Sequence, residues 1–292
     1  MEPSVTVTKA RVISSSHEMQ RVSEELRLSG KRIGVVPTMG YLHEGHLSLI
    51  RIAKDHSDVV ITSIFVNPTQ FASHEDFEKY PRDFDRDRRL AEEAGTDILF
   101  CPDTKNMYPE PYLTYVEVKN ITEVLEGKSR PIYFLGVTTI VTKLFHITKP
   151  HVAVFGQKDA QQEVVIKQMT RDMNFDVDIV VAPIVREPDG LAMSSRNVYL
   201  SPEERKDAVI LYESLQLAER MIRNGERNAK AVISAMKKLI ERKKSATVDY
   251  ISIADRERLT QLGAFESNQS VLISLAVRIG NTRLIDNTSL TI

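Results

Sequence analysis

Residues 35–47 read Val-Val-Pro-Thr-Met-Gly-Tyr-Leu-His-Glu-Gly-His-Leu, and this stretch decides the fold. The apolar, β-branched run 33–36 just before it predicts a buried strand, which Pro37 and Gly40 interrupt. From about Glu44 the apolar side chains recur at helical spacing, at Leu47, Leu49, Ile50 and Ile52. The sequence therefore predicts a strand, a turn and a helix in immediate succession.

Two histidines lie at the predicted start of this helix. His43 and His46 are three residues apart and share one face of the first turn, and Gly45 between them lets a ligand approach the backbone. A helix N-terminus presents free N–H groups and a partial positive charge that suit a phosphate. Imidazoles can bind the same group near neutral pH. The alternative is that both histidines are ordinary cap or core residues.

Strands and helices alternate through residues 30–185. Buried strands are expected at 59–66, 98–100, 152–155 and 177–181, with a short one at 115–118. Helices are expected at 83–94, at 133–147 and after Gly156, and an amphipathic helix at 15–29 precedes the first strand. This alternation predicts an α/β fold, a Rossmann-like, doubly wound parallel sheet.

The pattern changes after Pro188-Asp189-Gly190, which we interpret as a hinge. Ser201 followed by Pro202 is typical of a helix start, and apolar spacing continues that helix to Ala218. A further helix at 228–243 and strands at 248–253, 271–277 and 282–285 follow. We therefore expect two domains, a catalytic one at 1–187 and a smaller α+β lid at 188–292.

Polar residues follow several of the predicted strands, where ligands bind in open α/β sheets. Asn67 and Gln70 come after the strand at 59–66, and Gly156-Gln157-Lys158-Asp159 after the strand at 152–155. A lysine there can reach phosphate oxygens, and Met193-Ser194-Ser195-Arg196 combines hydroxyls with a guanidinium in a similar way. The alternatives are an Asn-Pro turn and ordinary surface residues.

Composition excludes several classes of function. The 292 residues carry 39 basic and 40 acidic side chains, a net charge of −1, which predicts no general affinity for nucleic acid or an anionic membrane. The one cysteine, Cys101, excludes an internal disulfide. No signal-peptide pattern or run of transmembrane length is present. We expect a cytoplasmic protein.

Neither the P-loop pattern nor Gly-x-Gly-x-x-Gly occurs, so a nucleotide must be held in another way. His-x-Gly-His with a much later Met-Ser-Ser-Arg resembles the paired signatures of nucleotidylyltransferases and class I aminoacyl-tRNA synthetases. Within that superfamily the chain resembles the pantothenate synthetases across nearly its whole length. The motifs that carry the likeness lie at 37–46, 65–71, 80–82, 136–139, 155–159 with 161–162, 194–197 and 280–287.

This resemblance implies ATP-dependent joining of pantoate to β-alanine through a pantoyl adenylate, a step of vitamin B5 and coenzyme A biosynthesis. It implies catalytic roles for His46, His43 and Lys158, with His46 donating a proton to the leaving phosphate. It also implies an ATP site formed by Met39, Gly40, Tyr41, Leu42, His43, Glu44, Gly45, His46, Gly156, Gln157, Lys158, Asp159, Val185, Met193, Ser194, Ser195 and Arg196.

The resemblance implies the remaining ligands as well. Gln70 and Gln162 would hold pantoate, and Asn67 with Gln70 would lie near β-alanine. Asp87 would contact Mg²⁺, since carboxylate oxygens suit that ion. A homodimer is also implied.

The chain departs from the family pattern in one loop, where Tyr133 and Leu135 replace the usual residues. Two other functions stay open at this point. One is another adenylate-forming ligase or nucleotidylyltransferase, although a tRNA synthetase lacks support because no basic appended domain occurs. The other is a nucleotide-binding regulator without catalytic activity.

Overall fold

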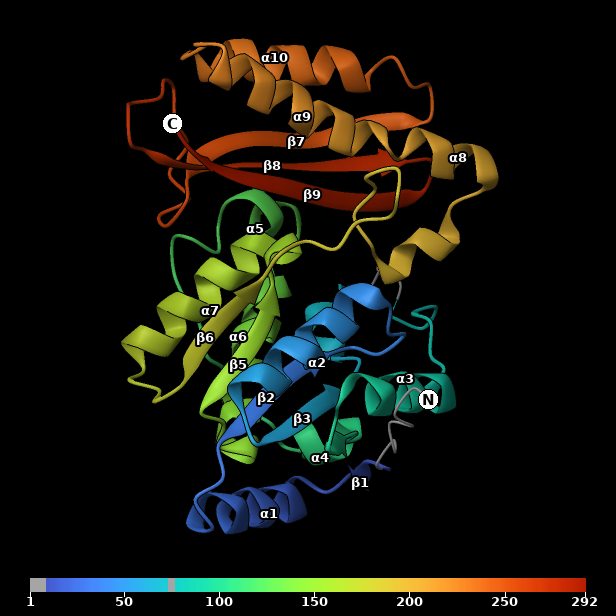
Figure 1. Cartoon of the computed structure of the whole chain (residues 1–292), viewed down its shortest axis with the longest axis vertical. Coiled ribbons are helices and arrows are strands. Elements are labelled where there is room, and N and C mark those ends of the chain that lie inside the picture. Colours follow the sequence, from blue (N-terminus) through green and yellow to red (C-terminus); the bar gives the residue numbers. More distant parts are fainter. Residues whose placement is uncertain (1–8, 73–76) are drawn as a thin grey trace, which may run out of the picture. The chain divides into compact units, whose positions relative to one another are not determined.

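The computed structural model describes residues 9–72 and 77–292, which form two compact units (Figure 1). The first unit comprises residues up to Gly156 together with Val165–Ala182, and the second comprises Gln157–Val164 together with Pro183–Ile292. This division runs at 182/183 rather than at the expected 187/188. It also assigns residues 157–164, which we expected in the first domain, to the second unit.

The sheet of the first unit is six-stranded and parallel throughout, which confirms the predicted Rossmann-like architecture. Its spatial order is β1 (Arg11–Ile13), β4 (Ile98–Phe100), β3 (Val59–Ile64), β2 (Ile33–Thr38), β5 (Val152–Gly156) and β6 (Asp178–Ala182). The direction of chain progression reverses between β2 and β5. In doubly wound sheets, ligands bind at such a switch point.

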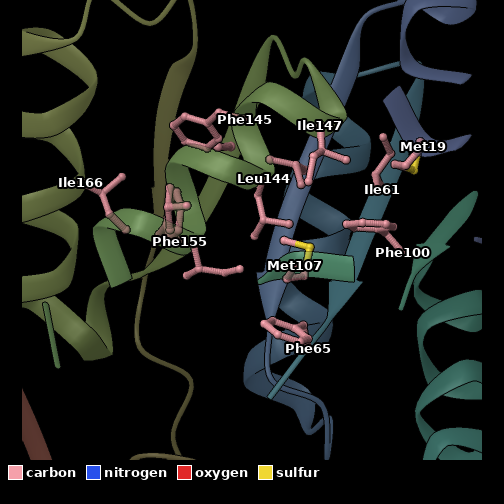
Figure 2. Close-up of a cluster of buried hydrophobic side chains, with 14 of the residues drawn as sticks. Met19, Ile61, Phe65, Phe100, Met107, Leu144, Phe145, Ile147, Phe155 and Ile166 are labelled. Carbon is pink, nitrogen blue, oxygen red and sulfur yellow. The ribbon is translucent and has the colours of Figure 1, made fainter. Parts of the chain in front are cut away.

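Helices cover both faces of this sheet because its strands are apolar on both sides. On one face, Val35, Ala153 and Phe155 pack with side chains of α1 (Ser16–Leu28), α6 (Tyr133–Thr148) and α7 (Ala160–Asp172). Figure 2 shows part of this cluster, including Leu144, Phe155 and Ile166. On the other face, Val36 and Val154 pack with α2 (Glu44–His56) and α3 (Phe84–Ala94).

Two local expectations for the first unit are wrong. Pro37 does not interrupt β2, which continues to Thr38, because the β5 ladder ends at Val35 and leaves only β3 beside the proline. Residues 115–118 form no strand. The Val116 backbone instead bonds to the hydroxyls of Thr138 and Thr139 on α6. Two short helices complete this unit, α4 (Thr104–Met107) and α5 (Leu125–Ser129).

The second unit is an antiparallel sheet with helices packed on one face, as expected for a smaller α+β domain. The strands are β7 (Ala246–Asp255), β8 (Ser270–Ile279) and β9 (Thr282–Thr291), in that spatial order. In Figure 1, α9 (Ile210–Arg223) and α10 (Ala229–Ile240) lie along this sheet. The helix expected from Ser201 onward divides into α8 (Pro202–Asp207), capped by Ser201, and α9.

Residues 188–190 form a tight turn within the second unit instead of a connection between the units. The amide of Gly190 donates to the carbonyl of Glu187 at 2.8 Å, and the amide of Glu187 donates to the carbonyl of Leu191 at 2.8 Å. A Cβ on Gly190 would lie 2.0 Å from the Tyr212 ring, so the turn is packed closely against α9. The sequence signal of Pro-Asp-Gly was therefore a turn signal.

Within the described ranges, no helix has both the length and the apolar character needed to cross a bilayer.

Candidate active site

The two histidines of the decisive stretch cap helix α2. His43 is the N-cap residue, and its Nδ1 accepts the amide N–H of Gly45 at 3.1 Å. Nδ1 of His46 accepts the amide N–H of His43 at 3.3 Å, which completes a reciprocal capping arrangement. The ring centroids are 4.1 Å apart. Each ring is therefore oriented by a backbone amide at Nδ1, which leaves Nε2 to carry the proton of the neutral imidazole.

The helix start differs from the expectation in one respect. The amides of His46 and Leu47 donate to the carbonyl of His43, and the amide of Gly45 donates to its side chain. These N–H groups were expected to be available to a phosphate. The cap therefore occupies these three N–H groups in the structure, and phosphate binding at this turn stays a prediction.

The loop between β2 and α2 has an unusual backbone. Gly40 and Tyr41 both have positive φ, at 83° and 50°, a conformation that costs free energy for a tyrosine. The Asp87 carboxylate stabilises it by accepting the amides of Tyr41 at 2.6 Å and Leu42 at 2.7 Å. Asp87 is on α3 and is only 1% exposed. A buried carboxylate therefore holds the loop that leads into the two histidines.

Asp87 was expected to contact Mg²⁺, and that contact stays a prediction. Burial raises the pKa of its carboxyl above the usual value, whereas the two backbone amides lower it. Arg86 adds one guanidinium contact at 3.3 Å. Across 9–72 and 77–292, no three His, Cys, Asp or Glu side chains gather in a way that could hold a metal ion. The described residues therefore build no metal cage around Asp87.

Asn67 and Gln70 lie in the 3-10 turn η1 (Pro68–Gln70) that follows β3, with Asn67 as its N-cap. The Asn67 side chain donates to the carbonyl of Gly136 at 3.2 Å and accepts from the hydroxyls of Thr69 at 3.0 Å and Tyr108 at 2.9 Å. It is 1% exposed. In the structure Asn67 thus holds the turn that carries Gln70, and its contact with β-alanine stays a prediction.

The loop that departs from the family pattern also supports Gln70. Arg130 donates to the carbonyl oxygen of Gln70 at 3.1 Å, and its guanidinium lies 4.0 Å from the centre of the Tyr133 ring. Tyr133 therefore stabilises the arginine through a cation–π contact. Gly136 passes so close that a Cβ there would lie 2.5 Å from the Thr69 carbonyl oxygen.

The other expected phosphate-binding residues belong to the second unit. Lys158 and Asp159 lie in η2 (Gln157–Asp159), and Gln162 follows in the first turns of α7. Ser194 caps η3 (Ser195–Tyr199) by accepting the amide of Arg196 at 3.2 Å. The amide of Met193 donates to the carbonyl of Val185 at 3.0 Å, which ties the two ends of the preceding turn together.

The predicted site residues thus fall into two sets, one in each unit. The first unit holds Met39, Gly40, Tyr41, Leu42, His43, Glu44, Gly45, His46, Gly156, Asn67, Gln70 and Asp87. The second holds Gln157, Lys158, Asp159, Gln162, Val185, Met193, Ser194, Ser195 and Arg196. Glu44 forms an ion pair with Arg51 on the same helix.

Several supporting residues could not be assigned from the sequence. Asn287 and Asp286 are buried and form a network with the partly buried Arg186 in the second unit, and Arg130 supports Gln70 in the first. Asn287 and Asp286 lie in the motif at 280–287, but nothing in the sequence indicates what this motif does. Their partners are distant in sequence, so spacing alone does not reveal them.

Comparison with known proteins identifies the family of this chain. The family model for pantoate–β-alanine ligases matches residues 11–289. A pantothenate synthetase of Thermotoga petrophila is 54% identical over 280 residues, which cover 96% of this chain and 99% of that protein. One from Acetivibrio thermocellus is 54% identical over 277 residues, covering 95% and 98%.

Solved structures agree as well. Pantothenate synthetase from Thermus thermophilus superposes with a TM-score of 0.88 at 42% identity, covering 95% of this chain and 98% of that one. The ligase from Francisella tularensis, solved in complex with β-γ ATP and β-alanine, gives 0.77 at 36% identity, covering 96% and 97%. The chain belongs to the pantoate–β-alanine ligase family.

Proposed function

We propose that this protein makes pantothenate from pantoate, β-alanine and ATP in two steps. A carboxylate oxygen of pantoate attacks the α-phosphorus of ATP, and the bond to pyrophosphate breaks, which gives pantoyl adenylate. The amine of β-alanine then attacks the acyl carbon and loses a proton, and AMP leaves with the electrons of the C–O bond. Pantothenate remains as the product.

The observation that carries this proposal is the capped pair of histidines after β2. Both rings accept a backbone amide at Nδ1, at 3.1 Å and 3.3 Å, and so present Nε2–H as the donor. Donors fixed before the reaction stabilise charge as it develops, without reorganisation. We propose that His43 and His46 contact the ATP phosphates and that His46 donates to the leaving pyrophosphate.

The second unit supplies the remaining charge. We propose that Lys158 neutralises charge on the phosphates during transfer, a reaction in which positioning and electrostatics dominate. Ser194, Ser195 and Arg196 would bind the pyrophosphate end through hydroxyl and guanidinium donors.

For the organic substrates, we propose that Gln70 and Gln162 hold pantoate. An amide offers a donor and an acceptor, which suits the hydroxyl and carboxylate groups of this acid. Gln70 is 7% exposed and its backbone is fixed by Arg130. Asn67, which orders the same turn, would lie near β-alanine.

We further propose that Mg²⁺ enters bound to the ATP phosphates. This ion keeps several of its waters and is usually held through one or two carboxylates and the substrate phosphates. The absence of a three-ligand group among the described residues is compatible with that mode, and a contact of Asp87 with the ion stays a prediction. No step of the mechanism here depends on the ion.

The location and assembly are also proposals. ATP as a substrate favours the cytoplasm. A homodimer is supported by two large exposed side chains in the extended segment after α4, Leu113 at 83% and Tyr115 at 51% exposure. Light scattering coupled to gel filtration distinguishes a dimer from a monomer.

The proposed function is tested by incubating the protein with ATP, Mg²⁺, pantoate and β-alanine and identifying the products by mass spectrometry. We expect equal amounts of pantothenate, AMP and pyrophosphate, and no AMP when either acid is omitted. Formation of ADP, or AMP formation with a different acid only, would exclude the proposal. A binding regulator without activity would give no product at all.

A further inference from the structure

Two neighbouring residues of β9, Asp286 and Asn287, support the segments of the second unit that are proposed to bind phosphate. These segments are residues 157–159 and 193–196. Nδ2 of Asn287 donates to two carbonyl oxygens, those of Gln157 and Lys158, each at 2.9 Å. Oδ1 of Asn287 lies 3.5 Å from Nε2 of Gln157. Asn287 is 2% exposed. Both N–H groups of the amide are therefore used to fix the backbone of the residue pair that includes Lys158.

The preceding residue, Asp286, fixes the turn that comes before the other segment. Its carboxylate accepts Arg186 Nη1 at 2.6 Å and Nη2 at 3.0 Å, a bidentate pair. The same guanidinium donates to the carbonyl of Gly190 at 3.0 Å and lies 4.5 Å from the centre of the Tyr212 ring. Asp286 is 2% exposed. This ion pair therefore anchors the turn that leads directly into Met193.

The strand that carries both residues is a rigid support. β9 pairs with β8 along its whole length, and Asp286 and Asn287 are opposite Leu275 and Ser274. The backbone N–H of Asn287 also donates to the Asp286 carboxylate at 2.8 Å, so the two residues are ordered together. Functional groups held from a strand are placed more accurately than groups held by loops alone.

We propose that Asp286 and Asn287 are positioning residues for adenylation, which hold Lys158 and the Met193–Arg196 segment in fixed register. The proposal rests on the role proposed above for Lys158. A lysine carries its point charge on a stem of limited length, so the position of its backbone limits which phosphate oxygens the charge can reach. A misplacement of about 1 Å can lower a rate about 100-fold.

The test compares Asn287→Ala with Thr288→Val, its neighbour on β9. Thr288 bonds to Glu219 on α9 and to neither phosphate-binding segment. Asn287→Ala should lower the rate of pantoate-dependent adenylation about 10- to 100-fold, with a smaller change in KM for ATP. It should leave the reaction of preformed pantoyl adenylate with β-alanine unchanged. Thr288→Val should lower the melting temperature only.

A double-mutant cycle with Lys158→Ala separates positioning from general damage. If Asn287 acts through Lys158, Asn287→Ala should change the rate of the Lys158→Ala protein less than about threefold. The inference would be overturned if the rate losses of the two single variants multiplied in the double variant. It would also be overturned if Asn287→Ala slowed adenylation and the attack of β-alanine equally. If Asn287→Ala does not fold, Asn287→Ser, which keeps a hydroxyl donor, takes its place under the same criteria.

Failure of the proposed function has a different signature. If the unaltered protein showed no pantoate-dependent adenylation, the proposed function itself would be overturned, whatever the variants did. Normal activity of Lys158→Ala would overturn the role of the lysine and this inference with it. Normal activity of Asn287→Ala, beside a defective Lys158→Ala, would overturn the inference alone.

Discussion

The carboxylate of Asp87 accepts the backbone N–H of Leu42 at 2.7 Å, across 45 residues of sequence. Its second oxygen accepts the neighbouring amide of Tyr41, whose φ is 50°. A side chain on α3 thus stabilises a strained loop that ends one residue before His43. This relationship gives the buried carboxylate a structural role, which is to hold the loop.

Replacing Asp87 with asparagine should weaken that loop. The substitution puts an NH₂ group where an oxygen accepted an amide, so one buried donor loses its partner. We expect the free energy of unfolding to fall by about 1–3 kcal/mol and the KM for ATP to rise, as measured by urea unfolding and steady-state kinetics. Asp85→Asn, at an exposed position of the same helix, is the control and should change neither. Unaltered stability with a greater need for Mg²⁺ would assign Asp87 to the ion instead.

His46→Ala should affect the rate of adenylation far more than ATP binding, because the ring is proposed to interact most strongly with the transferring group. The expected loss in rate is about 10²- to 10⁴-fold, measured in single-turnover experiments beside nucleotide titrations. The matched control is His56→Ala, at the other end of the same helix, which should keep full activity. A loss confined to the attack of β-alanine would move His46 to the second step.

Gly136→Ala should disturb the turn that carries Gln70. Its Cβ would lie 2.5 Å from the Thr69 carbonyl oxygen and 2.9 Å from Cγ of Gln70, so the turn must shift. We expect a loss of about 1–3 kcal/mol in stability and a larger increase in KM for pantoate than for ATP. Gly263→Ala, where no atom lies within 4 Å, is the control. Equal changes in both KM values would show that the turn does not serve pantoate specifically.

The pH dependence of stability should include His151. Its Nδ1 accepts the amide of Ile33 at 3.0 Å at the start of β2, and burial, followed by the charges of Arg27 and Arg32, lowers its pKa. The unfolded chain therefore takes up a proton more readily than the folded protein. Stability should be fully present above about pH 6.5, the ordinary pKa of histidine, and should decline as the pH falls below it.

His151→Asn tests this contribution, because the amide oxygen can still accept the Ile33 N–H but does not titrate near neutrality. We expect a smaller loss of stability between about pH 7 and 5 than in the unaltered protein, measured by urea unfolding at each pH. His17→Asn, on the exposed side of α1, should follow the unaltered protein. An identical pH dependence for His151→Asn would refute the argument.

The elements that the sequence predicted best have a uniform hydrophobic period. The helix from Glu44, the strand after Asp58 and the helix from Tyr133 all form close to where their apolar spacing placed them. Residues 115–118 also have strand composition. Their backbone bonds go to threonine hydroxyls on a helix, and local composition does not encode such tertiary partners.

The candidate site was also predictable only in part, because some of its contacts join residues that are distant in the sequence. His43 and His46 follow a strand and start a helix, so their neighbourhood is local and visible in the sequence. Asn287 lies 130 residues from Gln157, and only the fold shows that its amide holds that segment. The apparent hinge at 188–190 has strong turn residues, but nothing local shows that Gly190 is packed on Tyr212.

The central claim is that this protein activates pantoate as its adenylate, and isotope exchange between pyrophosphate and ATP tests it most directly. The exchange requires reversible adenylation and no second substrate. We predict that labelled pyrophosphate enters ATP when pantoate is present and β-alanine is absent, and that little exchange occurs without pantoate. Exchange promoted by an amino acid and not by pantoate would contradict the account.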